Sequence, residues 1–256
     1  QQVFETELRG KPVVVLSNND GCAIARTTSA KALGVRMGHP AHELRDLVKQ
    51  HGLILRSANF ALYGDLSRRV LEVLRGWMPR VESYSIDESF AWVPIADAQK
   101  RLASAHAIRE RVHRWVGIPN CVGMGPTKTL AKLANKVAKR GAGVVDLSDR
   151  EVREDTLREF PIGDVWGVGP RWEAKLKALG IETALQLRDA PGELVLERFG
   201  VVLRRTQREL QAHPCLSLQE VEPDRQQIVV SRSFGQRVTE HDLVHQAIAT
   251  FTERAC

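Results

Sequence analysis

Two adjacent carboxylates, Asp87 and Glu88, are the residues most able to do chemistry, and they lie in the stretch "YSIDES" (residues 84–89). Val81 before them and "FAWV" (90–93) after them predict a strand, a tight turn and a second strand, with both acids at or beside the turn. Paired carboxylates suit Mg²⁺, which prefers oxygen ligands. The plainer interpretation is that acidic residues favour exposed turns, so other parts of the chain must decide between the two.

A lysine-rich helix is predicted about 40 residues later, in "GPTKTLAKLANKVAKR" (125–140). One face carries polar side chains at i, i+4, i+7 and i+11, namely Lys128, Lys132, Asn135 and Lys139. The opposite face is apolar, with Leu130, Leu133 and Val137. Ammonium groups near a helix start suit phosphates, although a row of solvated lysines is the common alternative.

A glycine turn is the sharpest signal in the second half of the chain. In "PIGDVWGVGPRWEAKLKALGIET" (161–183), Gly167, Val168 and Gly169 lead into a helix that begins near Arg171. Glycines let a turn approach another backbone closely, and the first N–H groups of the next helix can bind a phosphate. This pattern predicts a helix-hairpin-helix that contacts a duplex backbone without reading its sequence. A plain helical hairpin is the alternative.

Two further segments give weaker signals. Arg26 and Lys31 follow a predicted buried strand, "KPVVVLSNN" (11–19), and could contact a triphosphate. Arginine and lysine are also ordinary residues of helix surfaces. Residues 197–210 are a weaker candidate for a second helical hairpin.

Strand and helix patterns alternate over about residues 1–147, which predicts one α/β layer structure. Residues 148–220 contain short helical patterns and glycine turns, which predicts an all-α domain. The polar segment 219–227 is predicted to be a linker. "IVVSRSFGQRV" (228–238) then predicts a strand that opens a new domain, and a helix follows it.

Composition limits the possible partners and compartments. The net charge is +6, and residues 1–145 carry 22 lysines and arginines against 12 acidic residues, which permits a polyanionic partner. Four scattered cysteines without metal-ligand spacing favour a reducing compartment and argue against a zinc site. No apolar run has the roughly 20 residues of a membrane span, and no signal-peptide pattern opens the sequence. We therefore expect a cytoplasmic protein that does not contact a membrane.

The three strong patterns are compatible with one reaction. Carboxylates that hold Mg²⁺, lysines that neutralise a triphosphate and a domain that grips duplex DNA together favour nucleotidyl transfer on DNA. A nucleotidyl cyclase or a nuclease would explain the acids but not the hairpin domain. A non-catalytic DNA-binding module remains a further alternative, as does a piece of a gene product with no function of its own.

Six ordered motifs resemble the Y-family (translesion) DNA polymerases, most closely the UmuC-type catalytic subunits of bacterial DNA polymerase V. The motifs are "KPVVVLSNNDGCAIAR", "AKALGV", "YSIDES", "GPTKTLAKLANK", "DVWGVGPR" and "SRSFG". The resemblance implies an α/β palm with fingers, an all-α thumb with the helix-hairpin-helix, and the start of an α+β little finger. The implied ranges are fingers 1–62, palm 63–147, thumb 148–220, linker 221–227 and little finger 228–256. The implied activity is error-prone, DNA-directed DNA synthesis in the SOS response to DNA damage.

The resemblance also implies roles for single residues. Asp87 matches a metal-ligand aspartate and Glu88 the neighbouring catalytic glutamate, with Mg²⁺ as the metal. The residues implied to contact the incoming nucleotide are Lys31, Lys139 and Arg26. The residues implied to contact DNA are Lys128, Lys132, Gly167, Val168, Gly169 and Arg171. The implied partners are primer-template DNA, a deoxynucleoside triphosphate, a UmuD-type dimer, RecA and the sliding clamp.

The family's first palm strand, with a further metal-binding aspartate and an aromatic steric gate, would lie upstream of Gln1. Most of the little finger and the clamp-binding tail would lie downstream of Cys256. We therefore expect this chain to be a fragment that incorporates nucleotides only when the upstream strand is restored. Primer extension with and without that strand tests the expectation, and extension by the bare chain would contradict it.

Overall fold

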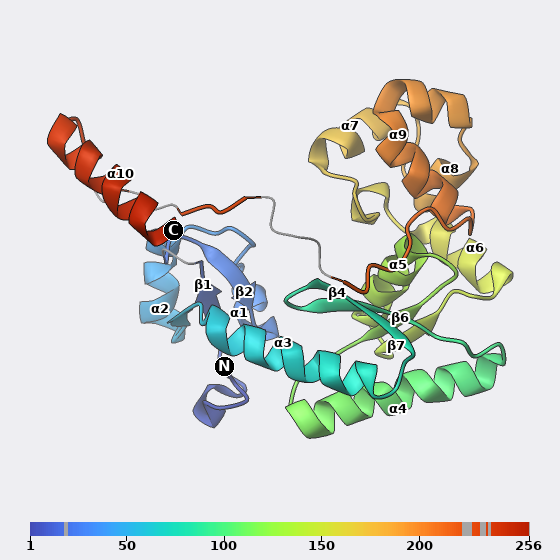
Figure 1. The fold of residues 1–256 in the computed structure, drawn as a ribbon, viewed down its shortest axis with the longest axis horizontal. Coiled ribbons are helices and arrows are strands. Elements are labelled where there is room, and N and C mark those ends of the chain that lie inside the picture. Colours follow the sequence, from blue (N-terminus) through green and yellow to red (C-terminus); the bar gives the residue numbers. More distant parts are fainter. Residues whose placement is uncertain (18–19, 222–226, 231–233, 235–236, 256) are drawn as a thin grey trace. The chain divides into compact units, whose positions relative to one another are not determined.

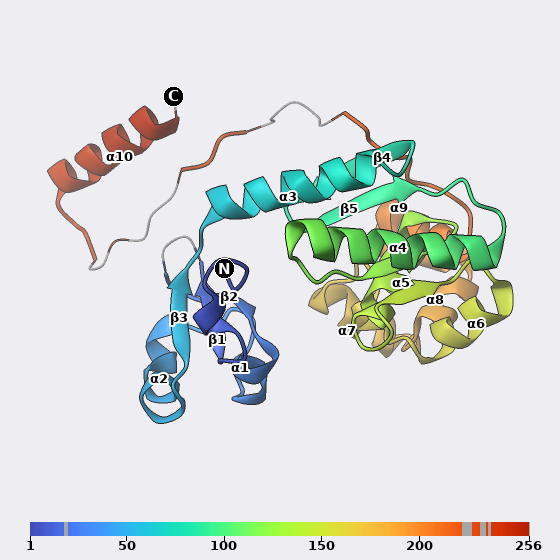
Figure 2. The ribbon, with the colours of Figure 1, turned by 90° about the horizontal axis from the view of Figure 1, so that it is seen from below.

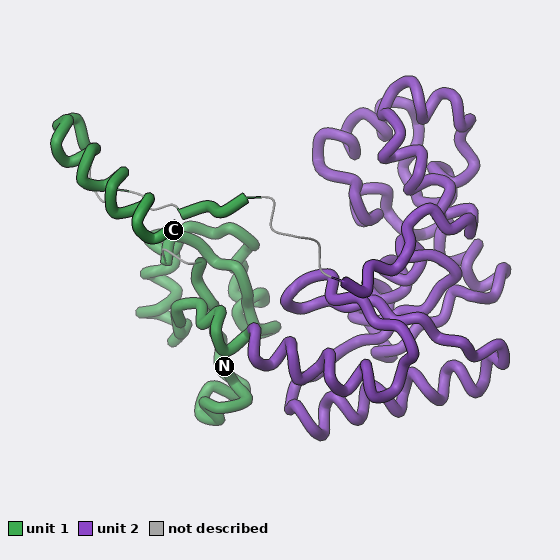
Figure 3. Tube along the Cα trace, in the orientation of Figure 1, with its two compact units in different colours: residues 1–63, 222–256 green, residues 64–221 purple. Residues whose placement is uncertain are grey.

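The computed structural model describes residues 1–17, 20–221, 227–230, 234 and 237–255. The chain divides into two compact units, which Figure 3 shows in different colours. Unit 1 consists of residues 1–63 and 222–256, and unit 2 consists of residues 64–221. The finer division into fingers, palm, thumb and little finger stays a prediction.

Unit 1 is built on a three-stranded sheet in the order β2-β1-β3 (Figure 2). β1 (Val13–Leu16) pairs antiparallel with β2 (Ala23–Arg26) and parallel with β3 (Ile54–Ser57). The buried strand predicted within residues 11–19 is thus confirmed over 13–16, and residues 18–19 lie outside the described residues. A parallel pair needs a long crossover, and here the chain between β2 and β3 forms the helices α1 (Thr28–Ala32) and α2 (Arg45–His51).

Three further helices belong to the described part of unit 1. η1 (Thr6–Leu8) and η2 (Ala41–Leu44) are 3₁₀ helices, and α10 (His241–Ala255) is the helix predicted after the linker. The strand predicted at 228–238 is wrong for the described residues of that segment, 228–230, 234 and 237–238, because none of them lies in a strand. A strand needs a neighbour for its N–H and C=O groups, and the described strands offer this segment none.

Unit 2 contains two small sheets and most of the helices (Figure 1). Its elements are α3 (Phe60–Arg75, which begins in unit 1), β4 (Arg80–Ser85), β5 (Glu88–Trp92), α4 (Ala98–Val116), β6 (Val122–Met124), α5 (Lys128–Ala138), β7 (Val144–Asp146), α6 (Arg150–Glu159), η3 (Ile162–Asp164), α7 (Pro170–Ala178), α8 (Ala184–Asp189) and α9 (Gly192–Leu210). β4 and β5 form an antiparallel hairpin, whereas β6 and β7 are parallel, with α5 in their crossover. The single α/β layer predicted over 1–147 is wrong, because its strands form three separate sheets divided between two units.

The β4–β5 hairpin has two different faces because side chains alternate along a strand. Val81 is buried against Leu71 of α3 and Ile108 of α4, with Ala91 packed beside them. Figure 1 shows α3 and α4 along one side of these strands, and the helices α6 to α9 lie on the other side, beyond α5. The second face of the hairpin, which includes Glu82, is therefore available to α5.

Helix α5 packs closely against β6. Gly123 makes this possible, because a Cβ at this position would lie 2.0 Å from the backbone nitrogen of Asn135. Thr127 caps the helix by accepting a hydrogen bond from the backbone N–H of Leu130. Leu130 and Leu133 belong to one buried cluster with the apolar residues of segment 147–210. The predicted apolar face of α5 thus packs against the helices of segment 147–210.

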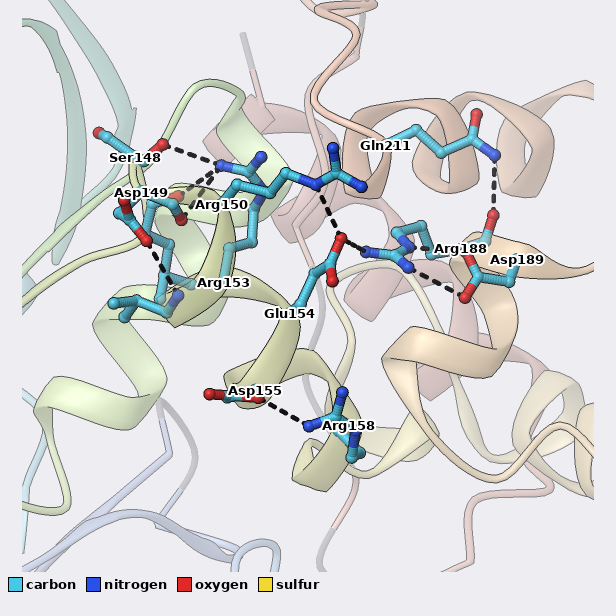
Figure 4. Close-up of polar contacts among 12 residues, drawn as sticks. Ser148, Asp149, Arg150, Arg153, Glu154, Asp155, Arg158, Arg188, Asp189 and Gln211 are labelled. Atoms are coloured by element: carbon cyan, nitrogen blue, oxygen red, sulfur yellow. Dashed lines mark hydrogen bonds and ion pairs between the residues drawn. The ribbon is translucent and has the colours of Figure 1, made fainter.

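Residues 148–210 are helical, as predicted, and an ion-pair network joins two of the helices (Figure 4). Glu154 of α6 accepts a hydrogen bond of 3.1 Å from Arg150 and forms an ion pair of 3.2 Å with Arg188 of α8. The hydrogen bond from Arg150, opposed by burial and supported by the charge of Arg188, holds the pKa of Glu154 below its ordinary value. Arg188 also pairs with Asp189, so one guanidinium connects both helices.

Helix α9 bends at Gly200, whose backbone is not helical (φ 80°, ψ −179°). The bend separates residues 192–199 from 201–210, and the second helical hairpin suggested for 197–210 stays a prediction. Val201 and Val202, which open the second half, are more than half exposed.

Glu209 is a fully buried carboxylate that holds three segments together. One of its oxygens accepts hydrogen bonds from the backbone N–H and the hydroxyl of Thr129, at 2.9 and 2.7 Å. The other accepts from the backbone N–H groups of Cys215 and Leu216, at 3.1 and 3.0 Å. A buried anion needs such donors to replace its hydration. The end of α9 is thereby fixed to the first turn of α5 and to the chain that follows.

We expect Glu209→Gln to lower the free energy of unfolding by about 2 kcal/mol, because either orientation of the amide turns its NH₂ group toward two donors. Urea denaturation measures the change. Glu197→Gln, on the exposed side of the same helix, is the matched control and should change stability by less than about 0.5 kcal/mol. Equal effects of the two substitutions would contradict the structural role of Glu209.

Candidate active site

The two adjacent carboxylates lie where the sequence placed them. Ile86 and Asp87 form the two-residue turn of the β4–β5 hairpin, and Glu88 is the first residue of β5. Asp87 is exposed, and its carboxylate accepts a hydrogen bond of 2.8 Å from the hydroxyl of Ser85. Tyr84 is an extra residue in the β4 register, since Ser83 pairs with Ser89 and Ser85 with Glu88. A bulge of this kind redirects the side chains beside it.

Two lysines of α5 reach the second face of the hairpin. Lys128 binds the buried carboxylate of Glu82, and only 11% of the lysine side chain and 6% of the glutamate side chain are exposed. Lys132, one turn later, donates to Glu88 at 2.5 Å, with 20% and 32% of the two side chains exposed. Both predicted DNA-facing lysines therefore bind carboxylates. The pair at Glu82 is the more buried of the two.

The same row of cations continues along α5. Lys136 donates to Asp164 of η3 at 2.5 Å, and Arg140, just after the helix, donates to the other oxygen at 2.8 Å. We call Lys128, Lys132, Lys136 and Arg140 the cation row. Its spacing is i, i+4, i+8 and i+12, so it differs from the predicted polar face, in which Asn135 and Lys139 took the later positions. The amide of Asn135 instead donates to the backbone carbonyl of Cys121.

Asp164 joins the helical segment to the cation row. The hydrogen bond from Lys136, opposed by burial and supported by the charge of Lys136 and by Arg140, holds the pKa of this carboxyl below its ordinary value of 3.8. Asp164 directly precedes the turn that carries the glycines. The cation row therefore fixes both the carboxylate hairpin and the start of the glycine loop, which we define as residues 165–169.

Three aromatic rings fill the space beside these ion pairs. The centroid of Trp166 lies 5.5 Å from that of Tyr84, with the rings nearly perpendicular, and 5.9 Å from that of Phe90. Tyr84 and Phe90 are themselves 5.4 Å apart. The ammonium of Lys132 lies 5.2 Å from the Tyr84 ring and 5.7 Å from the Trp166 ring. These are distances at which a ring attracts a cation.

The glycine loop has the features that the sequence predicted. Val168 is buried and anchors the loop in the helical core, whereas Gly167 and Gly169 are exposed. Gly167 has a φ of +87°, which favours glycine. Gly169 precedes α7, Pro170 occupies its first turn, and Arg171 is exposed. The start of α7 and one arginine thus face solvent together.

The remaining predicted residues do not belong to the cation row. Lys139 is exposed and follows the last turn of α5. Arg26 and Lys31 belong to unit 1. Arg26 ends β2 and donates to the backbone carbonyl of Val35 at 3.2 Å, and Lys31 is exposed on α1.

The donor set at the hairpin turn fits a hard divalent cation in its chemistry. Asp87 and Glu88 supply carboxylate oxygens, and Ser85 adds a hydroxyl held against Asp87. Mg²⁺ is often held by one or two carboxylates and keeps several waters. Within the described residues, no group of three or more histidine, cysteine or acidic side chains is arranged to hold a metal. Asp87 and Glu88 stay the candidate ligands that the sequence predicted.

Sequence reasoning missed four residues of this region, namely Glu82, Lys136, Asp164 and Trp166. The spacing of four residues from Lys128 to Arg140 was visible and could have identified Lys136. Nothing in the sequence connects Trp166 with Tyr84, since 82 positions separate them.

None of the helices in the described part of the chain has the length and apolarity of a membrane crossing.

The sequence of this chain is similar to those of many known proteins. Residues 1–136 match the impB/mucB/samB family, and residues 151–181 match the HHH motif of the IMS family. Protein ImpB from Salmonella typhimurium is 46% identical over 264 residues, and protein UmuC from the LT2 strain of that species is 44% identical. Each match covers the whole chain and 62% of the relative. DNA polymerase IV from Moorella thermoacetica is 35% identical, over 79% of the chain and 51% of that protein.

Solved structures share the fold. The crystal structure of DinB from Sulfolobus solfataricus has a TM-score of 0.69 at 22% identity, and the insertion ternary complex of Dbh DNA polymerase has a TM-score of 0.71 at 24% identity. Each covers 82% of this chain and 62% of the other. At such low identity the likeness concerns the fold alone. It confirms the predicted fold class, a mixed α/β structure with a helix-hairpin-helix region.

We expect Asp164→Asn to destabilise the protein at pH 6 by up to about 1 kcal/mol, because the charged form of Asp164 binds Lys136 and Arg140. Since its pKa in the folded protein is below 3.8, the stabilisation is present above pH 3.8 and is lost as the pH falls through the lower folded value. Urea denaturation between pH 6 and pH 3 should therefore show the two proteins converge in acid. Asp155→Asn, at a 74% exposed side chain, is the control. A gap that persists or widens in acid would contradict the assignment.

Proposed function

Because the chain belongs to the impB/mucB/samB family, we propose that it performs error-prone translesion DNA synthesis. The reaction is the template-directed transfer of a nucleotide from a deoxynucleoside triphosphate to the 3′-hydroxyl of a primer, as part of the response to DNA damage. The chain spans 62% of the length of its ImpB and UmuC relatives, so the proposal concerns the protein to which this sequence contributes.

One observation carries the proposal. The exposed Asp87 and the half-buried Glu88 lie at a hairpin turn, on the side of α5 that also bears the cation row, and the glycine loop of the helix-hairpin-helix contacts the same hairpin through Trp166. An acidic pair for a cation and a loop suited to phosphates therefore belong to one unit. If the two acids served only the turn, nothing would require the glycine loop to pack against the same hairpin.

The proposed roles follow the exposure of each group. Asp87 and Glu88 are the catalytic and metal-binding carboxylates. Lys139, which is exposed, would contact the triphosphate of the incoming nucleotide, and the same role stays a prediction for Lys31 and Arg26 of unit 1. Lysine suits this task because its ammonium is a compact charge that can follow a phosphate.

The metal in this proposal is Mg²⁺, held by Asp87 and Glu88. When bound, such ions supply activation of the primer hydroxyl and stabilisation of the leaving pyrophosphate. The chain itself contributes the hydroxyl of Ser85, which orients one oxygen of Asp87. It also contributes Lys132, which neutralises Glu88.

The proposed DNA contact is the glycine loop with the start of α7. Gly167 and Gly169 leave room for a phosphate to approach the backbone, Val168 anchors the loop, and Arg171 adds a positive charge. Lys128 and Lys132 were also expected to face DNA. In this proposal their ammonium groups serve the carboxylate hairpin instead, because both are bound to glutamates.

The proposed partners beyond DNA and nucleotide come from the family resemblance. They are a UmuD-type dimer, RecA and the sliding clamp, and the proposed location is the cytoplasm. The alternative function is a non-catalytic DNA-binding protein, in which the glycine loop grips a duplex and the acids serve only the turn. Metal-dependent binding of a deoxynucleoside triphosphate, abolished by substitution of Asp87, separates the two.

We expect Asp87→Ala to abolish nucleotide incorporation in the complete protein and to leave primer-template affinity within a few-fold, because Asp87 is exposed and supports no buried contact. Primer extension and a DNA-binding titration at fixed salt measure the two quantities. In the chain itself, the same substitution should remove Mg²⁺-dependent binding of the nucleotide.

Glu110→Ala is the control for the loss of one exposed carboxylate, since Glu110 is an exposed residue within α4. It should leave incorporation intact. A large loss of DNA binding in Asp87→Ala would instead indicate a structural role for the turn and would favour the alternative.

A further inference from the structure

We infer that Trp166 is a positioning residue that holds Lys132 against Glu88, so that a divalent cation must compete with this ammonium for the charge of the carboxylate. The inference deepens the proposed function and rests on it, because it concerns the same pair of acids. It assigns to the glycine loop a second task beside binding DNA, namely setting the cation affinity of the site.

The first step is the environment of Lys132. Its ammonium has the carboxylate of Glu88 on one side, at 2.5 Å, and the rings of Tyr84 and Trp166 at 5.2 and 5.7 Å. A cation near aromatic faces is stabilised there by the ring quadrupoles, and the effect increases as water is excluded. Only 20% of the lysine side chain is exposed. The rings therefore favour the position in which the ammonium binds Glu88.

The second step is how Trp166 is held. Val165 on one side of it and Val168 two residues after it are both buried in the helical core, so the backbone is anchored before and after Trp166. The ring packs on Tyr84 and Phe90. Because backbone and ring are both fixed, the distance between Trp166 and Lys132 is set by the glycine loop. A residue in a mobile turn could not set it.

The third step compares the two lysine–glutamate pairs on the hairpin. Lys128 and Glu82 resemble Lys132 and Glu88, since the ammonium of Lys128 lies 5.0 Å from the ring of Phe90. Glu82 is buried and also accepts a hydrogen bond from the backbone N–H of Gln219. The first pair therefore joins β4 to α5 and to the segment that follows α9. Glu88 is 32% exposed and has the exposed Asp87 beside it. Only the second pair, among these two, is open to exchange with a cation from solvent.

The consequence is a competition with a defined sign. Lys132 neutralises Glu88 by binding one of its oxygens, so a divalent cation that binds this carboxylate competes with the ammonium for its charge. Removing the ammonium should tighten cation binding, and loosening it by removal of the Trp166 ring should do the same to a smaller extent. Trp166 acts through Lys132, so its effect should disappear when the lysine is absent.

Binding of Mn²⁺ alone, followed by the electron paramagnetic resonance of the free ion, tests the inference on the whole chain. We expect Lys132→Met to tighten Mn²⁺ binding about fivefold, the scale of a partly exposed ion pair. Trp166→Ala should tighten it about twofold, the scale of a cation–π contact near the surface. Trp166→Phe, which keeps a ring, should bind Mn²⁺ as the unchanged chain does.

Two controls separate the inference from simpler effects. Lys136→Met removes one positive charge from the same helix, one turn further along, and should change Mn²⁺ affinity much less than Lys132→Met. Trp166→Ala combined with Lys132→Met should bind Mn²⁺ as Lys132→Met alone does. A purely structural role for Trp166 would change affinity equally in both backgrounds, and that result would overturn the inference.

The inference and the proposed function can fail separately. If Glu88→Gln abolishes Mn²⁺ binding while Lys132→Met leaves it unchanged or weaker, the carboxylates bind the metal and the competition is wrong. If Glu88→Gln and Asp87→Asn leave Mn²⁺ binding unchanged, the metal site of the proposed function is wrong, and the inference is overturned with it.

Discussion

The row of cations on α5 is the constraint on which the rest of unit 2 depends. Four positive side chains at intervals of four residues bind, in turn, Glu82 of β4, Glu88 of β5 and Asp164 of η3. The apolar side of the same helix is buried in the core of segment 147–210. One helix therefore fixes the carboxylate hairpin with its charges and the helical segment with its leucines. The geometry of the candidate site follows from the direction of this helix.

The strength of each ion pair varies with burial, and burial also determines whether the pair can exchange its partner. Burial of Lys128 and Glu82 removes competing water, so loss of either partner would leave an unpaired charge in the interior. Lys136 and Arg140 are more exposed, and a surface pair of this kind contributes little by itself. Lys132 and Glu88 lie between these limits. This intermediate exposure permits a contact that is stable and can still be exchanged.

The glycine loop has two neighbours with different chemistry. Gly167 and Gly169 face solvent, where a phosphate can approach the backbone, whereas Trp166 faces the hairpin and its aromatic neighbours. In the proposed function, these are the DNA side and the metal side of one short segment.

The sequence by itself determined the elements and their chemical character. The turn at Asp87, the helix over Lys128–Ala138 and the glycine turn before α7 all follow from local patterns, since strand alternation, helical spacing and glycine preferences act over a few residues. It also gave the family, because six ordered motifs leave few alternatives. The strand predicted at 228–238 is wrong for the described residues of that segment, since a strand pattern does not specify the partner that a strand needs.

Only the tertiary structure decided which charges meet. Lys132 and Glu88 are 44 positions apart, and Trp166 is 82 positions from Tyr84. A sequence pattern identifies a row of lysines but not the surface that it faces, because that depends on how helices and strands pack over long separations. Two of the lysines expected to bind phosphate, Lys128 and Lys132, are therefore bound to glutamates. Burial in the packed unit, rather than composition, determines which of them can release their partner.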